Sequence, residues 1–426
     1  MNVALPTIQD DLGGGLALQQ WVVDAYLLTL GSLLLVGGSL ADLYGPRRVF
    51  ALGTVAFGAV SVLCALAPTG NTLILARGLQ GVAGAILTPA ALAVIATTFH
   101  GEERGAAIGQ WTAWTGIAFV LGPLVGGWLI THASWRWIFV INVPIALATI
   151  ALVLYAVPGL AGGNERVHVD VVGGVLCVFG LGGPVFALIE APNRGWSDPL
   201  IVVSFVGGIV LLVAFVLWER RCVRPMLPLQ LFSKRNFTFA NLETVTVYAG
   251  LSCLTFFLVL FLQQLAGYSA LQSGIVLVPI TIVMFLLSPR FGRLAMRYGP
   301  RWFMGVGPLV AAVALVPIAR LEPHFTYWLD LAPWLLIFAV GLSMIVAPLT
   351  STVLADAGER DVGIASGFNN AVARVAGLLG IAVVGAAAAG STDQLDLPGY
   401  HTAMWITVAL VAAGGPIGLA GIRNIA

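Results

Sequence analysis

Long apolar stretches, separated by short polar turns, run along almost the whole chain. About thirteen of them approach the length of about 20 residues that a helix needs to cross a bilayer. None alternates apolar and polar residues with a period of two, so the pattern predicts membrane helices and not the strands of a barrel. The predicted helices cover residues 21–41, 49–67, 73–97, 106–130, 137–157, 171–190, 200–218, 238–262, 274–290, 303–320, 331–354, 363–388 and 403–422.

The composition supports the same fold class. Of the 426 residues, 59% are hydrophobic and only 9% are charged, against about 25% charged residues in an ordinary soluble domain. So few charges cannot cover the surface of a soluble protein of this size. We therefore expect an all-α polytopic membrane protein that lies in the lipid bilayer.

Several function classes are disfavoured by the scarcity of reactive residues. Lys234 is the only lysine, and Arg235 follows it, so the chain contains no phosphate-binding G-x-x-x-x-G-K-[ST] loop. The four cysteines and five histidines show neither metal-ligand nor catalytic spacing. The net charge of +1 gives no basic excess for nucleic acid. We expect no enzymatic activity, no cofactor and no metal.

The placement of basic residues predicts an orientation in the cell membrane. Most of the 20 basic residues fall on the side that holds residues 42–48, whereas Arg136, Arg194 and Arg320 fall on the other. The positive-inside rule makes the first side, and with it the C-terminus, cytoplasmic. Thirteen spans then leave residues 1–13 outside, too short to cross the bilayer, so we expect the first helix to be largely missing.

A ten-residue segment occurs twice. Gly38-Ser-Leu-Ala-Asp-Leu-Tyr-Gly-Pro-Arg47 matches Gly292-Arg-Leu-Ala-Met-Arg-Tyr-Gly-Pro-Arg301 at most positions. Two similar halves around a central site are typical of secondary transporters. We predict an N-terminal bundle over 1–157, two inserted helices with a cytoplasmic linker over 158–236, and a C-terminal bundle over 237–426.

The first copy, which runs into Arg48, resembles the loop between helices 2 and 3 of the major facilitator superfamily. Gly38 suits a close helix approach and Gly45 suits a tight turn. Asp42 can pair with a nearby arginine such as Arg47 or Arg48, which makes the loop a latch that closes one conformation. The second copy has Met296 in place of Asp42, so any latch there is weaker.

Two further segments resemble helix motifs of the same superfamily. Leu75-Ala-Arg77-Gly-Leu-Gln80-Gly resembles the helix-4 motif, whose arginine the family links to proton transfer. The alternative for Arg77 is a side chain that reaches back to the membrane surface. Leu121-Gly122-Pro123-Leu-Val-Gly126-Gly127 resembles the helix-5 motif of antiporters, in which the proline kinks the helix and the glycines form a smooth packing face.

The resemblance extends to the fourteen-helix drug:proton antiporter branch. Its segments include Trp21-Val-Val-Asp24-Ala-Tyr26, Ser134–Pro144 and Gln263-Gln264-Leu-Ala-Gly-Tyr268, and the inserted helix pair fits this branch. Polar residues within predicted spans default to functional hypotheses. The predicted proton-coupling and substrate residues are Asp24, Arg77, Gln80, Glu243, Asn370 and Arg374.

The resemblance implies a proton-coupled exporter of drugs or other small hydrophobic or cationic compounds that works by alternating access. Its expected partners are a small-molecule substrate, protons and the bilayer, and it is expected to be a monomer. The alternatives are an exporter of an endogenous metabolite, lipid or antibiotic, and a truncated member without function. A receptor or an intramembrane enzyme is disfavoured because it needs no repeated halves.

Overall fold

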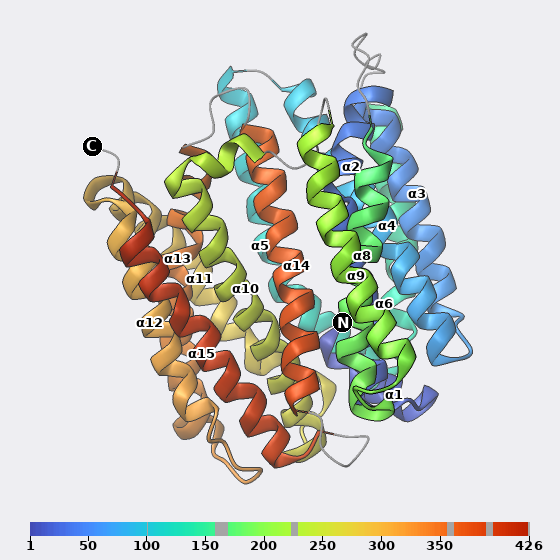
Figure 1. Cartoon of the computed structure of the whole chain (residues 1–426), viewed down its shortest axis with the longest axis vertical. Helices are drawn as coiled ribbons and strands as arrows, with labels where there is room; N and C mark the ends of the chain where they lie inside the picture. The colour runs from blue at the N-terminus through green and yellow to red at the C-terminus, as the bar shows by residue number, and fades with distance from the viewer. Residues whose placement is uncertain (100, 158–168, 223–228, 356–361, 389–394, 425–426) are drawn as a thin grey trace.

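The computed structural model describes residues 1–99, 101–157, 169–222, 229–355, 362–388 and 395–424. These residues form helices joined by short turns, with no β-strand among them (Figure 1). The α-helices are α1 (Leu5–Leu12), α2 (Gly15–Tyr44), α3 (Pro46–Ala65), α4 (Gly70–Thr98), α5 (Gly101–His132), α6 (Trp137–Val140), α7 (Asn142–Ala156), α8 (Val171–Arg194), α9 (Pro199–Arg221), α10 (Arg235–Leu260), α11 (Ala270–Tyr298), α12 (Pro300–Ile318), α13 (Ala332–Ala355), α14 (Val362–Ala388) and α15 (Leu397–Gly421). Short turns of 3-10 helix, η1 (Asn2–Ala4) and η2 (Leu229–Ser233), and of π-helix, η3 (Phe261–Leu265) and η4 (Tyr327–Leu331), complete the set.

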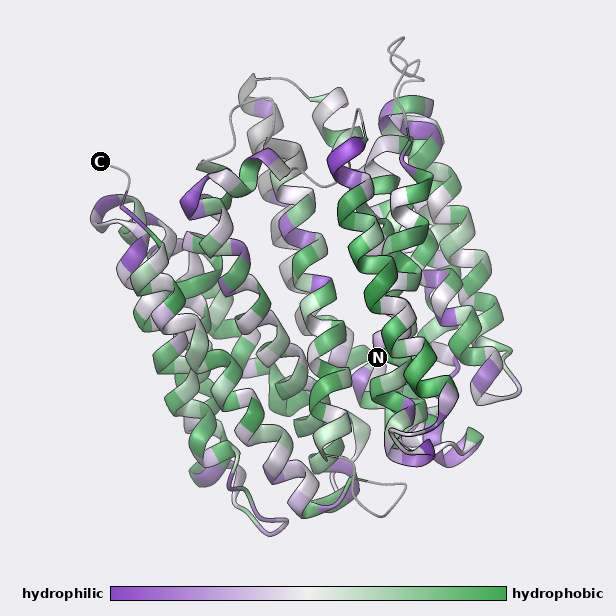
Figure 2. Cartoon of the chain, in the orientation of Figure 1, coloured by the Kyte–Doolittle hydropathy of each residue, from purple (hydrophilic) through white to green (hydrophobic). Residues whose placement is uncertain are grey.

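The predicted fold class is confirmed. Among the described residues, 12 helical segments are long and apolar enough to cross a membrane. Helix α5, which has 32 residues, covers the remaining predicted stretch near 106–130. Hydrophobic residues run along the helices, and hydrophilic residues gather near their ends (Figure 2).

The repeated segment builds the same turn twice. Gly45 lies between α2 and α3 with a φ of 89°, and Gly299 lies between α11 and α12 with a φ of 86°. Glycine adopts this left-handed region at no steric cost, and the proline that follows each glycine is preorganised for the first helical position. Both turns lie at the upper end of the molecule in Figure 1, which we call the arginine-rich end.

Equivalent arginines follow the two turns and make equivalent contacts. The Arg47 guanidinium donates a hydrogen bond to the Leu154 carbonyl near the end of α7, at 2.8 Å. Nε of Arg301 donates to the Leu419 carbonyl near the end of α15, at 2.7 Å. The last carbonyls of a helix lack partners within the helix, and a cation there is favourable. Each arginine therefore fastens the helix that follows its turn, α3 or α12, to the end of a later helix.

The helices pack as two groups that meet along two lines. Helix α2 packs on α4 and α3 on α7, while α10 packs on α14 and α15, and α12 on α13. The groups contact each other through α2 with α14 and through α5 with α11. Helices α8 and α9 pack on each other, and α8 also contacts α2 and α14. The boundaries 1–157, 158–236 and 237–426 stay a prediction, because packing alone does not define them.

Close packing of α2 on α4 does not depend on Gly38, contrary to the prediction. A Cβ on Gly38 would lie 3.8 Å from its nearest neighbour, Pro89, which is an ordinary contact. A Cβ on Gly37 would instead overlap the Ala85 carbonyl oxygen. Gly37 faces α4 one residue before the expected position, because the helical phase of a packing face cannot be read from a Gly-Gly pair alone.

Candidate functional site

A buried hydrogen-bond network surrounds Arg77 in α4. Nε of Arg77 donates to the Val22 carbonyl of α2 at 2.9 Å, and its guanidinium also donates to the Gln80 side-chain oxygen. The Gln80 amide in turn donates to Ser61 Oγ of α3 at 2.8 Å. The predicted pair Arg77 and Gln80 is thus brought together, and one chain of hydrogen bonds joins α2, α3 and α4.

Aromatic rings face the Arg77 guanidinium. Its Cζ lies 4.3 Å from the centroid of the Tyr26 ring and 6.0 Å from that of Phe139. A cation over an aromatic face gains about 2 kcal/mol when both groups are desolvated. No acidic side chain in the described part of the chain forms an ion pair with Arg77. The buried cation is therefore held by dipoles and rings, without a fixed counter-ion.

Asp24 and Glu243 are buried carboxylates without hydrogen-bond partners. Both side chains are 0% exposed, and none of their four carboxylate oxygens accepts a hydrogen bond within the described structure. Asp24 of α2 lies within electrostatic range of the Cys253 thiol of α10. An unpaired buried charge is costly, so such groups are rarely retained for stability. Asp24, predicted near the end of its helix, is as deeply buried as Glu243.

Asn370 and Arg374 lie on α14 and are exposed halfway along it. Neighbouring Asn369 donates hydrogen bonds to Asn241 Oδ1 at 3.1 Å and to Thr244 Oγ1 at 2.8 Å, both on α10. The six predicted residues therefore occupy different places and form no single site. Arg77 and Gln80 lie together within α4, Asp24 and Glu243 are buried in α2 and α10, and Asn370 and Arg374 are exposed on α14.

The exposure of one face of α14 changes along its length. Asn370, Arg374, Gly377 and Ile381 share this face, because they follow one another at helical spacing. The first two are exposed, whereas the last two are buried. The exposure of this face therefore stops near the middle of the helix.

Glutamine side chains close the opposite end of the molecule. Gln20 of α2 donates to the Ile381 carbonyl of α14 at 3.0 Å. Gln9 Oε1 of α1 accepts from Gln19 at 2.6 Å and from Gln264 of η3 at 3.1 Å. These bonds connect the beginning of the chain to the second group of helices. The two groups are thus held together at this end.

A π-helical turn, η3, positions Gln264 for its hydrogen bond with Gln9 of α1. In η3 the Ala266 amide bonds the Phe261 carbonyl five residues earlier, at 3.0 Å. The two glutamines in this turn both contact the N-terminal segment, since Gln263 donates to the Val3 carbonyl at 3.0 Å. π turns within helices are frequent at functional sites. In the sequence these glutamines belong to a segment that resembles the antiporter branch, but nothing in that segment indicates that they contact the N-terminal residues.

Comparison with known proteins explains this architecture. A sequence profile of the Major Facilitator Superfamily matches residues 1–381. The chain belongs to the Major Facilitator Superfamily. It is 37% identical over 396 residues to the puromycin resistance protein pur8 of Streptomyces alboniger, a match that covers 92% of this chain and 78% of that protein.

Other superfamily relatives have similar descriptions. The methylenomycin A resistance protein of Bacillus subtilis (strain 168) is 34% identical over 387 residues, 90% of this chain and 82% of that protein. The tetracenomycin C resistance and export protein of Streptomyces glaucescens is 32% identical over 384 residues, with 90% and 71% covered. The family membership and these relatives support a transporter rather than an enzyme.

Solved structures share the superfamily fold. One from work on substrate recognition in proton dependent oligopeptide transporters has a TM-score of 0.68 at 16% identity, covering 99% of this chain and 94% of that chain. The nucleoside transporter NupG has a TM-score of 0.63 at 13% identity, also with 99% and 94% covered. At such low identity these likenesses concern the fold alone.

The helix-5 glycines of this superfamily member do not act as one packing face. A Cβ on Gly127 would lie 2.7 Å from the Leu271 Cα of α11, so this position packs directly against backbone. A Cβ on Gly122 would meet nothing within 4 Å, and one on Gly126 would meet only Val3 at 3.8 Å. The predicted smooth face is therefore wrong for two of its three glycines. The close contact instead uses Gly127 and the Pro123 carbonyl.

A glycine of α11, missed in the sequence, completes that contact. A Cβ on Gly274 would lie 2.6 Å from the Pro123 carbonyl oxygen. Pro123 and Gly127 thus face α11 near the closed end of the transporter. A lone glycine in an apolar run gives no sign of which helix it meets, so sequence reasoning could not find it.

The latch expected in the 38–48 loop is not formed in this conformation. Asp42 is exposed, and within the described residues it makes no ion pair. Arg47 is occupied by the Leu154 carbonyl, and Arg48 is exposed. The predicted pairing of Asp42 with an arginine is therefore absent from the part of the chain that the structure describes.

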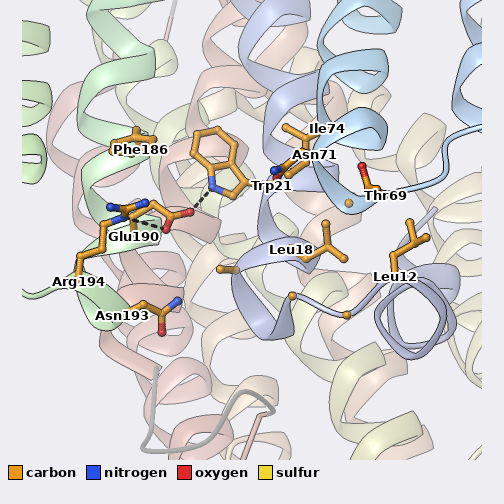
Figure 3. A pocket seen from close by; sticks show the side chains of 14 residues that line it. Leu12, Leu18, Trp21, Thr69, Asn71, Ile74, Phe186, Glu190, Asn193 and Arg194 are labelled. Carbon is orange, nitrogen blue, oxygen red and sulfur yellow. Dashed lines mark hydrogen bonds and ion pairs between the residues drawn. The ribbon is translucent and has the colours of Figure 1, made fainter.

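A cavity of about 670 Å³ opens at the closed end, between the start of α2, the start of α4 and the end of α8 (Figure 3). Trp21 Nε1 donates to Glu190 Oε1 at 2.9 Å, and Arg194 lies 3.7 Å from the same carboxylate. Both charges thus satisfy each other, which agrees with a structural role for Glu190.

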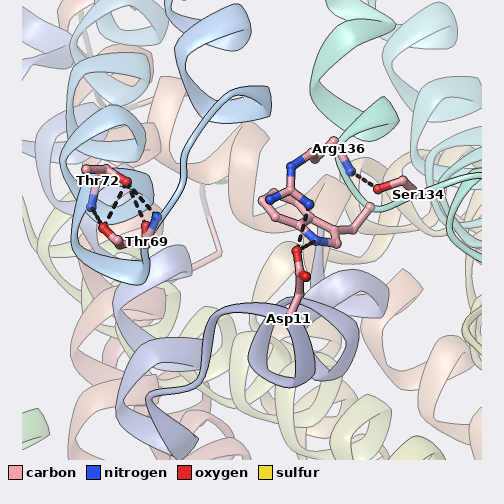
Figure 4. A network of polar contacts seen from close by, with 6 residues as sticks. Asp11, Thr69, Thr72, Ser134 and Arg136 are labelled. Carbon is pink, nitrogen blue, oxygen red and sulfur yellow. Dashed lines mark hydrogen bonds and ion pairs between the residues drawn. The ribbon is translucent and has the colours of Figure 1, made fainter.

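An ion pair fastens α1 to the turn before α6 (Figure 4). The Arg136 guanidinium and Trp135 Nε1 both donate to Asp11 Oδ2, at 2.6 and 2.9 Å. The hydrogen bond from Arg136 lowers the pKa of the Asp11 carboxyl below its ordinary value. A carboxyl with a lowered pKa stabilises the fold at pH values above its ordinary pKa, and this contribution is lost as the pH falls through the lowered value.

Asp11→Asn should therefore lower the thermal unfolding midpoint at pH 7, and the difference from the wild type should shrink below about pH 4, where the wild-type carboxyl takes up its proton. Midpoints of the purified protein measured from pH 7 to pH 3 check this. Asp10→Asn is the matched control, since the exposed neighbouring carboxylate makes no ion pair within the described residues. An equal difference at both pH values would contradict the role of the ion pair.

Proposed function

We propose that this transporter exports drugs or other small hydrophobic or cationic compounds from the cell in exchange for protons. It belongs, on this proposal, to the fourteen-helix drug:proton antiporter branch, with α8 and α9 as the inserted pair. It acts as a monomer in the cell membrane, with the arginine-rich end and the C-terminus in the cytoplasm. Resistance and export proteins among its relatives support the direction of transport.

The observation that carries the proposal is the change of exposure along α14. Asn370 and Arg374 are exposed, while Gly377 is buried against Ser252 of α10 and Ile381 is buried with its carbonyl bonded by Gln20 of α2. Alternating access requires such a half-open path, with a site near the middle that each end reaches in turn. The structure then corresponds to the state that loads substrate from the cytoplasm. Rocking of the two halves would break the glutamine contacts and release the substrate on the far side.

Proton exchange is assigned to the two buried carboxylates. Asp24 and Glu243 accept no hydrogen bond and form no ion pair within the described residues, so an ionised carboxylate would be poorly stabilised there. Each would carry a proton in from the far side, release it toward the arginine-rich end when a cationic substrate binds there, and take up another proton once movement of the halves has released the substrate. The Arg77 network, in which Arg77 forms no ion pair with a described residue, is the natural element to sense that change.

A second candidate function is export of an antibiotic that the cell itself makes. The cephamycin export protein CmcT of Amycolatopsis lactamdurans is 33% identical over 406 residues, 93% of this chain and 83% of that protein. The same fold and the same coupling serve both functions. Only the substrate that triggers proton movement separates them.

The test uses the full chain in proteoliposomes that contain a pH-sensitive dye. Ethidium, puromycin and a cephamycin are the probes. Addition of a substrate should move protons across the membrane in the direction opposite to substrate transport. Glu243→Gln and Asp24→Asn should each reduce drug-dependent proton movement at least tenfold, because an amide cannot exchange a proton. Glu322→Gln, at an exposed carboxylate, is the control. Transport that persists after the proton gradient is collapsed would contradict the coupling.

A further inference from the structure

One face of α11 is apolar and exposed over much of its length, and it ends in arginines. Ile282, Phe285 and Leu286 are 48%, 58% and 54% exposed. Arg290, Arg293 and Arg297 continue along the same side toward the arginine-rich end, at helical spacing, and all three are exposed. The α11 face, as we call these six residues, is thus apolar in its middle and cationic at its end.

The equivalent face of α2 is covered by another helix. The repeat places Leu28 and Val36 of α2 where α11 has Ile282 and Arg290. A Cβ on Gly182 of α8 would lie 3.3 Å from Leu28, and one on Gly174 would lie 3.0 Å from Val36. Helix α8 therefore shields this side of α2. No helix in the described part of the chain does the same for the α11 face.

Only the uncovered copy has the arginines. The α2 residues that correspond to Arg293 and Arg297 are Ser39 and Leu43, which carry no charge. No aspartate or glutamate occurs between Glu243 and Glu322. Within the described residues, Arg290, Arg293 and Arg297 form no ion pair. Three cations therefore lie together at the end of an apolar face that no described helix covers.

We propose that the α11 face binds an anionic phospholipid of the surrounding bilayer. Its phosphate would lie against Arg290, Arg293 and Arg297, because guanidinium groups match phosphate oxygens with paired hydrogen bonds. Its acyl chains would cover Ile282, Phe285 and Leu286. The eleven steps along the helix from Ile282 to Arg293 rise about 16 Å, roughly half of a hydrocarbon core of about 30 Å.

Aromatic residues next to the arginines fit the level of lipid headgroups. Tyr298 and Trp302 are 57% and 60% exposed at the turn between α11 and α12. Tyrosine and tryptophan are enriched where the hydrocarbon meets water. Arg301 is not part of the site, since its Nε is bonded to the Leu419 carbonyl.

A second copy of the chain is a poorer occupant of the α11 face. Two copies related by a twofold axis along the membrane normal would bring the same surface together at the same depth. The three arginines of one copy would then oppose those of the other, which is unfavourable. An anionic lipid neutralises these charges instead.

Native mass spectrometry of the full chain in detergent tests the proposal with phosphatidylglycerol and phosphatidylcholine as probes. The wild type should bind phosphatidylglycerol at least tenfold more tightly than phosphatidylcholine. Arg293→Gln with Arg297→Gln should weaken phosphatidylglycerol binding about 30-fold, since each arginine near a lipid surface contributes about 1 kcal/mol. Arg220→Gln with Arg221→Gln removes two exposed charges from the end of α9 and is the control, expected to bind as the wild type does.

Three outcomes would overturn the proposal. They are equal binding of both lipids to the wild type, undiminished phosphatidylglycerol binding by the α11 variant, and an equal loss in the control. A dimer joined by cross-links from Phe285→Cys would overturn it as well, in favour of a second copy. Lipid binding is measured without transport, so this test is independent of the proposed drug export.

Discussion

Replacing Arg77 with alanine is expected to reduce drug export at least 100-fold. The substitution removes a buried cation whose hydrogen bonds join the Val22 carbonyl and Gln80. Each polar group left without a partner costs about 1–3 kcal/mol in the apolar interior. Arg77→Lys keeps the charge but not the planar fork, so it should restore only part of the activity. Ethidium efflux from drug-sensitive cells, corrected for the amount of protein in the membrane, is the measurement.

A purely structural role for Arg77 is separated by a second readout. Gln80→Ala disturbs the same hydrogen-bond network but leaves the cation in place, whereas Arg77→Ala removes it. If the cation takes part in coupling, the pH dependence of transport in proteoliposomes should change in Arg77→Ala and stay as in the wild type in Gln80→Ala. Arg221→Ala, at an exposed position at the end of α9, is the charge control. Normal efflux by Arg77→Ala at normal protein levels would exclude any role in transport.

Gly127→Val is expected to reduce transport at least tenfold by forcing the closed end open. The new Cβ would lie 2.7 Å from the Leu271 Cα and 2.9 Å from the Ala270 carbonyl oxygen. Both are backbone atoms, so α5 and α11 must separate rather than adjust a side chain. Gly122→Val has the same helix, the same motif and the same change in volume, but open space around the Cβ, so it should retain most of the activity.

The conformational effect is measured separately from transport. A cysteine introduced at Gln264 should react faster with a membrane-impermeant maleimide in Gly127→Val than in the wild type, in a background without the four native cysteines. Gly122→Val should react as the wild type does. Equal reactivity in all three proteins would show that the contact at Gly127 does not hold the end closed.

The fold of this chain could largely be predicted from the sequence, because the length of an apolar run and the position of a glycine determine the local structure directly. Runs of about 20 apolar residues admit only helices in lipid, and the Gly45 and Gly299 turns follow from the Tyr-Gly-Pro sequence alone. The contacts between helices were harder to predict. Gly37 rather than Gly38 meets α4, and Gly127 rather than Gly122 meets α11. Which glycine of a helix makes the contact depends on the position of the partner helix.

The candidate site could be predicted from the sequence only where its residues are close together in the chain. Arg77 and Gln80 lie one turn apart on one helix and do form a network. The bonds of Gln264 with Gln9 and of Gln20 with Ile381 span hundreds of residues, and no local pattern indicates such partners. The ion pair expected for Asp42 depends on which conformation is adopted, which a sequence does not specify.

The π turn after α10 makes the glutamine contacts sensitive to chain length. Such a turn accommodates one residue more than an α-helical turn, and each residue of an α-helix adds about 100° of rotation. Deleting Leu262 would let the backbone relax into regular α-helix and would scarcely change the hydropathy of the chain. It would also swing Gln264 away from Gln9, so that a protein of nearly unchanged hydropathy would lose this contact at the closed end.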